Sequence, residues 1–203
     1  ELEFDGKGLR LVLVDGRFVP EMSRLDLPAG VWLGSTQAAI RERPALAQVL
    51  AGDAGADHPF AALNAAFFAD GFVLDVAPGA VVDKPIEIFH LASGAGDASL
   101  HTRSLVNIGA GSRATIFETC AGTGKYWRND FASWRIGDGA ALTRIVLAEE
   151  SPDAVHLGEV TATLGAKAWL DGFALLLGGG TVRHEANIAV AGDKAECHID
   201  GAF

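Results

Sequence analysis

The sequence has few cysteines, few charged residues and no long apolar run. Its two cysteines, Cys120 and Cys197, are 77 positions apart, so they form neither a close metal-binding pair nor the framework of a disulfide-rich domain. The longest apolar stretches, such as 173–180, are much shorter than the roughly 20 residues that a membrane span needs. These absences favour a soluble, cytoplasmic protein over a disulfide-stapled or membrane-spanning one.

Positive charge is also scarce. The 203 residues include 16 Lys and Arg against 26 Asp and Glu, which leaves a formal net charge of −10. The average field of such a protein repels a phosphate backbone and an anionic membrane surface, so neither nucleic acid nor a membrane is expected as a partner. Glycine is abundant, with 25 residues, beside 49% hydrophobic residues. This composition predicts many tight turns between buried apolar strands.

Residues 1–70 predict a small α/β region. The expected elements are a β-hairpin over 9–19, helices over 36–43, 44–50 and 59–68, and a linker over 52–57. Asp15-Gly16 is a typical hairpin turn. Ser35 is a suitable N-cap for the first helix, and Pro44 suits the first turn of the second because its missing N–H costs nothing there.

From residue 71 onward, short β-rich runs follow one another with a recurring glycine. The recurring positions are Gly79, Gly111, Gly139, Gly165 and Gly192, at intervals of 32, 28, 26 and 27 residues. The residues three before and three after each of these glycines are all aliphatic. Such a period accommodates two strands and two connections, which make one coil of a two-sheet solenoid.

The repeat predicts a mainly β fold, a right-handed parallel β-helix of about five coils over 71–203, in which the aliphatic residues stack inward from coil to coil. An antiparallel sandwich is the competing interpretation, but it does not require self-similarity at each position. The chain reaches Phe203 only 11 residues after Gly192, inside a coil. We therefore expect the helix to be incomplete at its C-terminal end and its exposed last coil to promote self-association as a homodimer.

Two short strings near the C-terminus contain potential metal ligands. Glu196, Cys197 and His198 are adjacent, but on a strand Cys197 faces away from the other two, so one ion cannot easily bind all three. The expected role of Cys197 is that of a small buried hydrophobe. His184 beside Glu185 is expected to be a hydrogen-bonded surface pair. Neither string is assigned a metal site.

The remaining motifs that suggest chemistry are weak. Cys120 has only Glu118 as a candidate ligand within four residues. The string GTGK at 122–125 resembles part of a phosphate-binding loop but lacks the earlier glycine and the following Ser or Thr of that motif. The string GGG at 178–180 lacks the strand-to-helix setting of such loops. Both strings are predicted to be turns, and no catalytic, cofactor-binding or metal-binding residue is assigned.

Some parallel β-helices cleave acidic polysaccharides with carboxylates and an arginine gathered on one outer face. The residues that could serve such a site are Asp138, Asp171, Arg144 and Arg183. Asp138 is expected in a corner of the coil, and a protein of charge −10 repels a polyanionic substrate unless cations are bound. A β-helix polysaccharide lyase or hydrolase is therefore kept only as the alternative function.

Four strings carry a resemblance that goes beyond architecture. They are FAALNAAFFADGFVLDVAPGAVVDKPIEIFHL (60–91), RIVLAEES (144–151), ALLLGGGTVRHE (174–185) and AECHIDGAF (195–203). Together and in this order they closely resemble the SufB/SufD family, the scaffold proteins of the SUF iron–sulfur cluster assembly system. Leu63-Asn64 and the low cysteine content are more similar to the SufD branch than to the SufB branch.

The resemblance implies a cytoplasmic scaffold that is not an enzyme, pairs with a SufB-like paralogue and carries a SufC-like ATPase. It implies an iron–sulfur cluster held transiently by the complex and ATP bound by the partner, with no cofactor bound by these coils. It also implies a chain truncated at both ends. The family's functional histidine has no counterpart among these residues, so the resemblance transfers no site residue.

Overall fold

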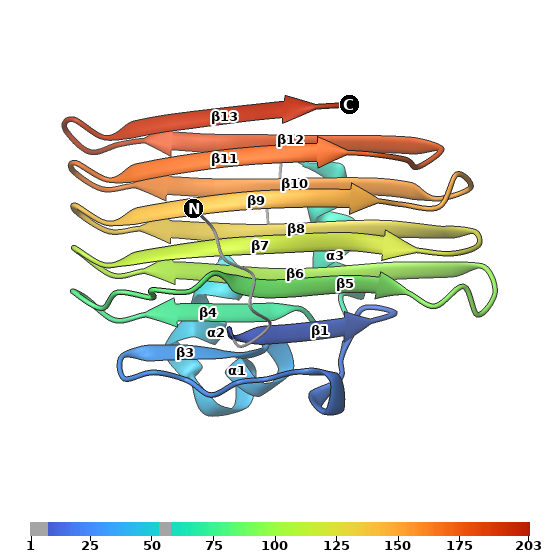
Figure 1. Ribbon diagram of the computed structural model, residues 1–203, viewed down its shortest axis with the longest axis horizontal. Coiled ribbons are helices and arrows are strands. Elements are labelled where there is room, and N and C mark those ends of the chain that lie inside the picture. Colours follow the sequence, from blue (N-terminus) through green and yellow to red (C-terminus); the bar gives the residue numbers. More distant parts are fainter. Residues whose placement is uncertain (1–7, 53–57) are drawn as a thin grey trace.

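The computed structural model describes residues 8–52 and 58–203, and its strands alternate between two facing sheets (Figure 1). Sheet A has the order β13 (Glu196–Ala202), β11 (Trp169–Leu176), β9 (Ala141–Glu149), β7 (Arg113–Gly122), β5 (Ile86–Ala92), β1 (Arg10–Val14), β2 (Arg17–Phe18). Sheet B has the order β12 (Thr181–Val190), β10 (Val155–Leu164), β8 (Tyr126–Ile136), β6 (Ala98–Ile108), β4 (Phe72–Val76), β3 (Val31–Ser35). Only the pairs β1–β2 and β3–β4 of these named strands are antiparallel. The predicted parallel β-solenoid of about five turns is confirmed.

The N-terminal elements follow from local sequence signals. Asp15 and Gly16 have φ angles of 49° and 72° in the turn of the predicted hairpin, now β1 and β2. The Ser35 hydroxyl accepts a hydrogen bond of 3.0 Å from the backbone N–H of Ala38, as an N-cap does. The strand β3 was not expected, and it forms because it pairs with β4 at the entrance to the first coil.

The remaining secondary-structure elements of the described residues are three α-helices and one 3-10 helix: α1 (Thr36–Glu42), α2 (Pro44–Gly52), α3 (Pro59–Phe67) and η1 (Pro20–Met22). The three predicted helices are confirmed within two residues at each end. The predicted linker at 52–57 lies outside the described residues except for Gly52, which ends α2. No described helix is long and apolar enough to cross a membrane.

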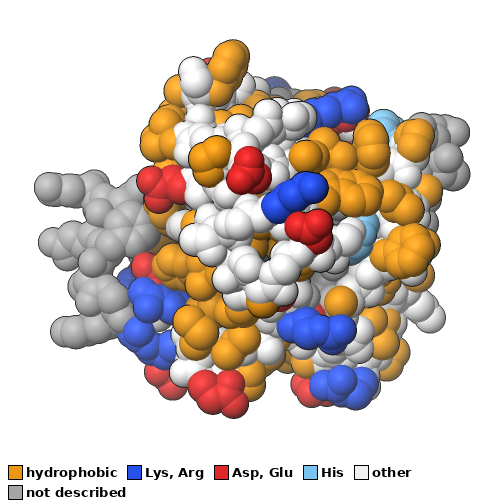
Figure 2. Space-filling view, turned by 90° about the vertical axis from the view of Figure 1, so that its right-hand side faces the viewer, with side chains coloured by type: hydrophobic (Ala, Val, Ile, Leu, Met, Phe, Trp, Pro, Cys, Tyr) orange, Lys and Arg blue, Asp and Glu red, His pale blue; other side chains and the backbone are white. Residues whose placement is uncertain are grey.

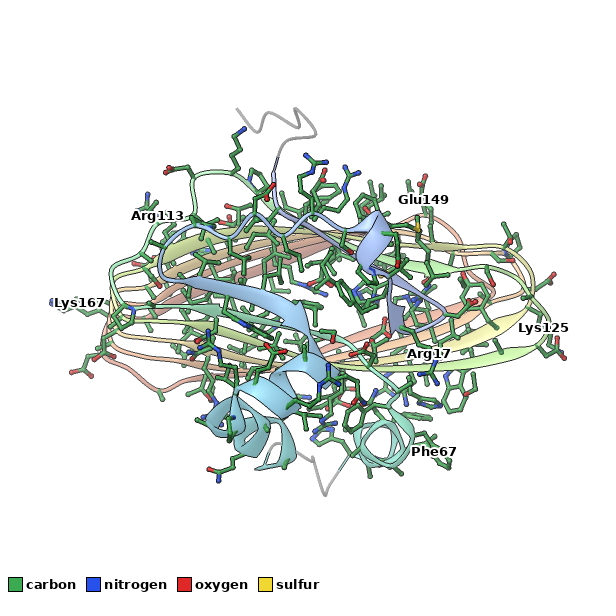
Figure 3. All side chains as sticks on the ribbon, turned by 90° about the horizontal axis from the view of Figure 1, so that it is seen from below. Arg17, Phe67, Arg113, Lys125, Glu149 and Lys167 are labelled. Carbon is green, nitrogen blue, oxygen red and sulfur yellow. The ribbon has the colours of Figure 1, made fainter. Side chains whose placement is uncertain are left out.

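The helices lie on the outer face of sheet B, on one side of the solenoid (Figure 3). The buried Asn64 of α3 donates hydrogen bonds of 2.8 Å to the carbonyls of Thr102 in β6 and Asn129 in β8. Its side-chain oxygen accepts a hydrogen bond from the buried guanidinium of Arg103. One amide side chain thus joins α3 to two successive coils.

The repeat seen in the sequence is real, but its alignment in the last two coils was wrong by two residues. Gly111 and Gly139 have positive φ angles of 67° and 65°, and the equivalent position of the next coil is Lys167, with a φ of 57°. Gly165 corresponds instead to Gly137, because each donates its N–H to the last strand residue of the preceding coil. The inward stack therefore runs through Ala114, Leu142, Leu170 and Cys197.

The coils turn at two corners that differ in regularity. The connections 109–112, 137–140, 165–168 and 191–195 repeat one hydrogen-bond pattern, and we call this side the repeating corner. The connections 93–97, 123–125, 150–154 and 177–180 vary between three and five residues, and we call this side the irregular corner. Arg113 and Lys167 lie near the first and Lys125 and Glu149 near the second, at opposite ends of the flattened cross-section (Figure 3).

Candidate functional site

The inward-facing side chains change character between the two corners. Toward the repeating corner they are apolar, mostly aliphatic, and form the main hydrophobic core. Toward the irregular corner apolar residues such as Ala92, Leu100 and Ala154 are mixed with many polar ones. We call the following set the polar cluster: His90, Glu118, Cys120, Tyr126, Arg128, Asp130, Arg144, Glu150, His156 and His184. From outside, the irregular corner shows charged side chains of both signs dispersed among apolar and other groups (Figure 2). The polar cluster lies inside the solenoid.

Glu118 and Arg144 form one ion pair of the cluster. The guanidinium donates two hydrogen bonds of 2.8 Å and 2.7 Å to the two carboxylate oxygens, and it also lies over the ring of Trp134. Burial by itself raises the pKa of Glu118, but the charge and hydrogen bonds of Arg144 outweigh burial and hold the pKa below its ordinary value. The carboxylate is therefore ionised and fixed in orientation.

Arg128 and Glu150 form a second ion pair nearer the irregular corner. Nε of Arg128 donates a hydrogen bond of 2.8 Å to Oε1 of Glu150, and the Tyr126 hydroxyl donates to Oε2. Burial raises the pKa of Glu150, but the His156 and Arg128 contacts prevail and lower it to about 2. Burial and the hydrogen bond to Glu150 raise the pKa of Tyr126 to about 12, so the phenol stays protonated.

His156 lies between two carboxylates. Its Nδ1 is 3.0 Å from Oε1 of Glu150, and its Nε2 is 3.4 Å from Oδ2 of Asp130. Burial lowers the pKa of His156, but the two carboxylates outweigh burial and raise it overall. Asp130 also accepts a hydrogen bond of 2.7 Å from the Thr102 hydroxyl, and its pKa is held well below the ordinary value despite burial.

A second imidazole, that of His184, lies next to His156. The ring centroids are 4.9 Å apart, and the rings meet edge to face. Gly158 makes this approach feasible, since a Cβ there would lie 3.2 Å from the His184 ring and 3.5 Å from Nε2 of His156. Burial and the neighbouring His156 lower the pKa of His184 to about 4, so its imidazole is neutral at neutral pH.

Cys120 is the only inward-facing thiol of the cluster. Burial, the largest influence, raises the pKa of Cys120 well above its ordinary value. Potential ligand atoms of Cys120, Glu150 and His156 all lie within 4.8 Å of one another. A cavity of about 680 Å³ adjoins the cluster, and both Cys120 and His156 line it. The cluster thus brings a thiol, a carboxylate and an imidazole together beside this cavity, a combination that can hold a proton or a metal ion.

Comparison with known protein families divides the chain within β5, in the first coil of the β-helix. The family model described as "SufBD protein N-terminal region" matches residues 7–88, and the model described as "SUF system FeS cluster assembly, SufBD core domain" matches residues 90–203. The chain belongs to the SufB/SufD family. The resemblance seen in the sequence is therefore confirmed, and the polar cluster lies entirely within the SufBD core domain.

A curated relative supports the SufD branch of the SufB/SufD family. The chain is similar to the "Iron-sulfur cluster assembly protein SufD" of Escherichia coli (strain K12), with 24% identity over 197 residues. The matched region is 95% of this chain but 44% of that protein. The chain thus spans less than half the length of the relative that it matches.

The structure separates the residues 196–198 as expected for a strand of this SufBD core. Cys197 faces inward and stacks on Leu170, and it packs against the main core. Glu196 and His198 face outward, with 3.9 Å between Oε2 and Nε2. The expected separation of Cys197 from Glu196 and His198 is confirmed, while Cys197 is partly buried rather than fully buried.

The prediction for His184 was wrong. Neighbouring residues of a strand point to opposite faces, so His184 faces inward to His156 while Glu185 faces outward. The outward partner of Glu185 is Arg183, whose NH2 donates a hydrogen bond of 2.6 Å to its carboxylate. The two histidines meet only because β10 and β12 are adjacent in sheet B.

The two glycine-rich strings are turns, as predicted. The string 122–125 joins β7 to β8, with a φ of 79° at Gly124. The string 178–180 lies between β11 and β12, with φ angles of 127° and 87° at Gly178 and Gly179. Both belong to the irregular corner, and neither precedes a helix.

The residues of the alternative polysaccharide site do not meet. Asp138 accepts a hydrogen bond from the N–H of Ala166 in the repeating corner. Arg144 is inside the solenoid on Glu118, whereas Asp171 is on the outer face of sheet A and Arg183 is on the outer face of sheet B. No carboxylate groove arises from these four.

Sequence reasoning missed most of the polar cluster. Arg128, Asp130 and His156 occupy inward positions of β8 and β10 where an alternating strand pattern calls for apolar residues. Glu150 follows β9 in a connection and has no such periodic signal. A register-based search for polar residues at inward positions would have found the strand members of the cluster but not Glu150.

Proposed function

We propose that this chain is the β-helix part of a scaffold subunit for SUF iron–sulfur cluster assembly, which performs no catalytic reaction itself. The observation that carries the proposal is the match of the SufBD core domain to residues 90–203. This range runs from within β5 to the last strand, β13. In the full-length protein the scaffold pairs with a SufB-like paralogue and carries a SufC-like ATPase. The iron–sulfur cluster is cargo that the complex holds transiently.

The architecture suits a scaffold that transmits movement from one bound partner to another. Each coil contacts its neighbours through two parallel hydrogen-bonded ladders, one in each sheet, so displacement of one coil must displace the next. ATP-driven movement of a partner bound to such a rod reaches the paired subunit without deforming the coils. The proposed location is the cytoplasm, which agrees with Cys120 and Cys197 being free thiols.

Co-purification of the full-length protein tests the proposal. The full-length gene product carrying an affinity tag is co-expressed with the SufB-like and SufC-like proteins of its own organism and then isolated. We expect both partners to co-elute in fixed proportion, and we expect deletion of the gene to lower the activity of iron–sulfur enzymes in the same cells. Elution of the tagged protein alone, with unchanged iron–sulfur enzyme activity in the deletion strain, would exclude the scaffold function.

Self-association through the last coil stays a prediction. Among the described strands, β13 has a partner only on its β11 side, and Ile199 is half exposed on it. Pairing with a second copy would satisfy the outer hydrogen-bonding edge of β13. Light scattering of the 203-residue chain at increasing concentration measures this, and a constant monomer mass contradicts it.

A further inference from the structure

Three members of the polar cluster converge although they are far apart in the chain. Cys120 belongs to β7, Glu150 to the connection 150–154, and His156 to β10. They are 3%, 4% and 2% exposed, and one potential ligand atom of each lies within 4.8 Å of those of the other two. The scaffold function proposed above makes no use of them, so their burial in one place calls for its own explanation.

The three side chains form a donor set for a divalent transition metal. Thiolate, imidazole and carboxylate together suit Zn²⁺ and Fe²⁺ better than Mg²⁺ or Ca²⁺, which prefer oxygen alone. In a tetrahedral site with metal–N and metal–O bonds of about 2.0–2.2 Å, the two ligand atoms are about 3.3 Å apart. Nδ1 of His156 and Oε1 of Glu150 are 3.0 Å apart, which is close to that separation.

The Nδ1 atom of His156 also lacks a satisfying partner. It is buried and makes no aligned hydrogen bond in the described residues, although Oε1 of Glu150 is close. A buried polar atom without a hydrogen bond destabilises the folded state. An ion placed between the imidazole, the carboxylate and the thiol of Cys120 would give this nitrogen a partner.

The residues around the three ligands are arranged as the outer shell of a metal site. Metal-binding histidines usually direct their other ring nitrogen to a carboxylate, which fixes the ring. Here Nε2 of His156 is 3.4 Å from Oδ2 of Asp130. Glu150 is likewise oriented by Arg128 and by the Tyr126 hydroxyl.

The local charge leaves room for a cation. The polar cluster contains three carboxylates, those of Glu118, Asp130 and Glu150, but two guanidiniums, with Arg128 on Glu150 and Arg144 on Glu118. One negative charge therefore needs a balancing proton or metal ion in this buried place. A divalent ion that displaces the protons of His156 and Cys120 restores the same balance, since metal ligands bind in their deprotonated forms.

We propose that Cys120, Glu150 and His156 bind one divalent transition-metal ion of the Zn²⁺ or Fe²⁺ class inside the β-helix. Two of the three ligands, Cys120 and His156, line the cavity of about 680 Å³, from which a fourth ligand would reach the ion. The inference rests on the geometry of these side chains and not on the scaffold function, so either can fail without the other.

Titration of the full-length, chelator-treated protein with Co²⁺ tests the site directly. We expect one equivalent to bind, with thiolate-to-cobalt charge-transfer absorption and the visible bands of a tetrahedral ion. Competition with Zn²⁺, and with Fe²⁺ under anaerobic conditions, identifies the preferred ion. X-ray absorption of the Zn²⁺-loaded protein should show one sulfur at about 2.3 Å and nitrogen or oxygen ligands at about 2.0 Å.

Substitutions then assign the ligands. Cys120→Ser should abolish the charge-transfer band, and His156→Gln should weaken binding by more than about 100-fold, beyond the 10–100-fold expected for the outer-shell change Asp130→Asn. The matched controls are Cys197→Ser and His198→Gln, which alter a cysteine and a histidine outside the cluster and should change nothing. Circular dichroism identifies any variant that does not fold.

Two results overturn the proposal. One is a wild-type protein without thiolate-to-cobalt absorption, because the site then contains only an ion-pair network with a protonated His156. The other is absorption that survives in folded Cys120→Ser but disappears in Cys197→Ser. If Cys120→Ser does not fold, a wild-type X-ray absorption spectrum without a sulfur ligand excludes the metal site instead.

Discussion

The two halves of the β-helix interior solve the same packing problem with opposite chemistry. Toward the repeating corner, Leu142 stacks between Ala114 and Leu170, and Cys197 continues the stack in the last coil. Toward the irregular corner, charged groups such as Arg128 and Glu150 occupy the interior and must be paired. The apolar half of the interior, beside the repeating corner, shows that these coils need no buried charge to stack. Because buried ion pairs seldom stabilise a fold over apolar substitutes, the polar half points to a role other than stability.

The largest expected effect comes from leaving one charge of the polar half unpaired. Arg144→Met removes the partner of the buried Glu118 and should lower the free energy of unfolding by about 3–5 kcal/mol. Glu118→Leu combined with Arg144→Met turns this position into an apolar one and should be close to neutral. Urea denaturation followed by circular dichroism measures both. Equal losses in the single and double variants would contradict the comparison, because the ion pair would then be stabilising in itself.

The aliphatic half should respond to loss of volume. Leu142→Ala leaves a cavity between two coils and should lower the free energy of unfolding by about 2–5 kcal/mol. Thr143→Ala, the next residue on the outer face of the same strand, serves as the control and should stay within about 0.5 kcal/mol of wild type. A small effect of Leu142→Ala would mean that the stack does not carry the stability assigned to it.

The repeating corner offers a smaller test where lysine replaces glycine at a positive φ angle, at Lys167 and again at Lys194 in the next coil. Lys167 has a φ of 57° where the two preceding coils have glycine, a conformation that costs a non-glycine residue roughly 1–2 kcal/mol. Lys167→Gly should therefore raise the unfolding midpoint, because it removes this strain. The net stabilisation should reach at most about 1 kcal/mol, because glycine loses more entropy on folding than lysine does. Gly139→Ala should do the reverse, and Lys125→Gly at the irregular corner should not stabilise. Calorimetry of the three variants measures their unfolding midpoints and so ranks their stabilities.

The smallest effect is expected from acid. Arg144 holds the pKa of Glu118 below its ordinary value of 4.5, so the stability contributed by this carboxylate is fully present above that value and is lost as the pH falls through the lowered pKa. The unfolding midpoint should therefore decrease as the pH falls below 4.5. The double variant Glu118→Leu with Arg144→Met should lose less over the same interval, and an identical pH profile would mean that other groups govern acid unfolding.

Much of the fold was predictable because its signals are local or periodic. The Asp15-Gly16 turn, the Ser35 cap and the aliphatic positions beside the recurring glycines each reflect a constraint on a few residues. The alignment error arose where Lys167 replaces a glycine, because sequence rules place lysine outside the positive-φ region. Gly165 belongs to a second glycine position, one that packs closely against the preceding coil. It was therefore aligned with Gly139, although the true counterpart of Gly139 is Lys167.

The polar cluster was not predictable in the same way. Cys120 had one candidate ligand nearby in the sequence, Glu118, and that residue binds Arg144 instead. Its spatial neighbours Glu150 and His156 come from the next coil and from the opposite sheet. Their distance from Cys120 depends on coil length and on how each connection crosses the irregular corner, neither of which a local motif encodes.

The sequence by itself determined that this chain coils, because strand alternation and a period set by two strands and two turns leave the aliphatic residues no other common face. It also carried enough family signal to place the chain among the SufB/SufD proteins. Only the tertiary structure decided what the coils enclose. Side chains 30 residues or more apart, such as Cys120 and Glu150, meet inside because stacked coils convert distance along the chain into contact between neighbours.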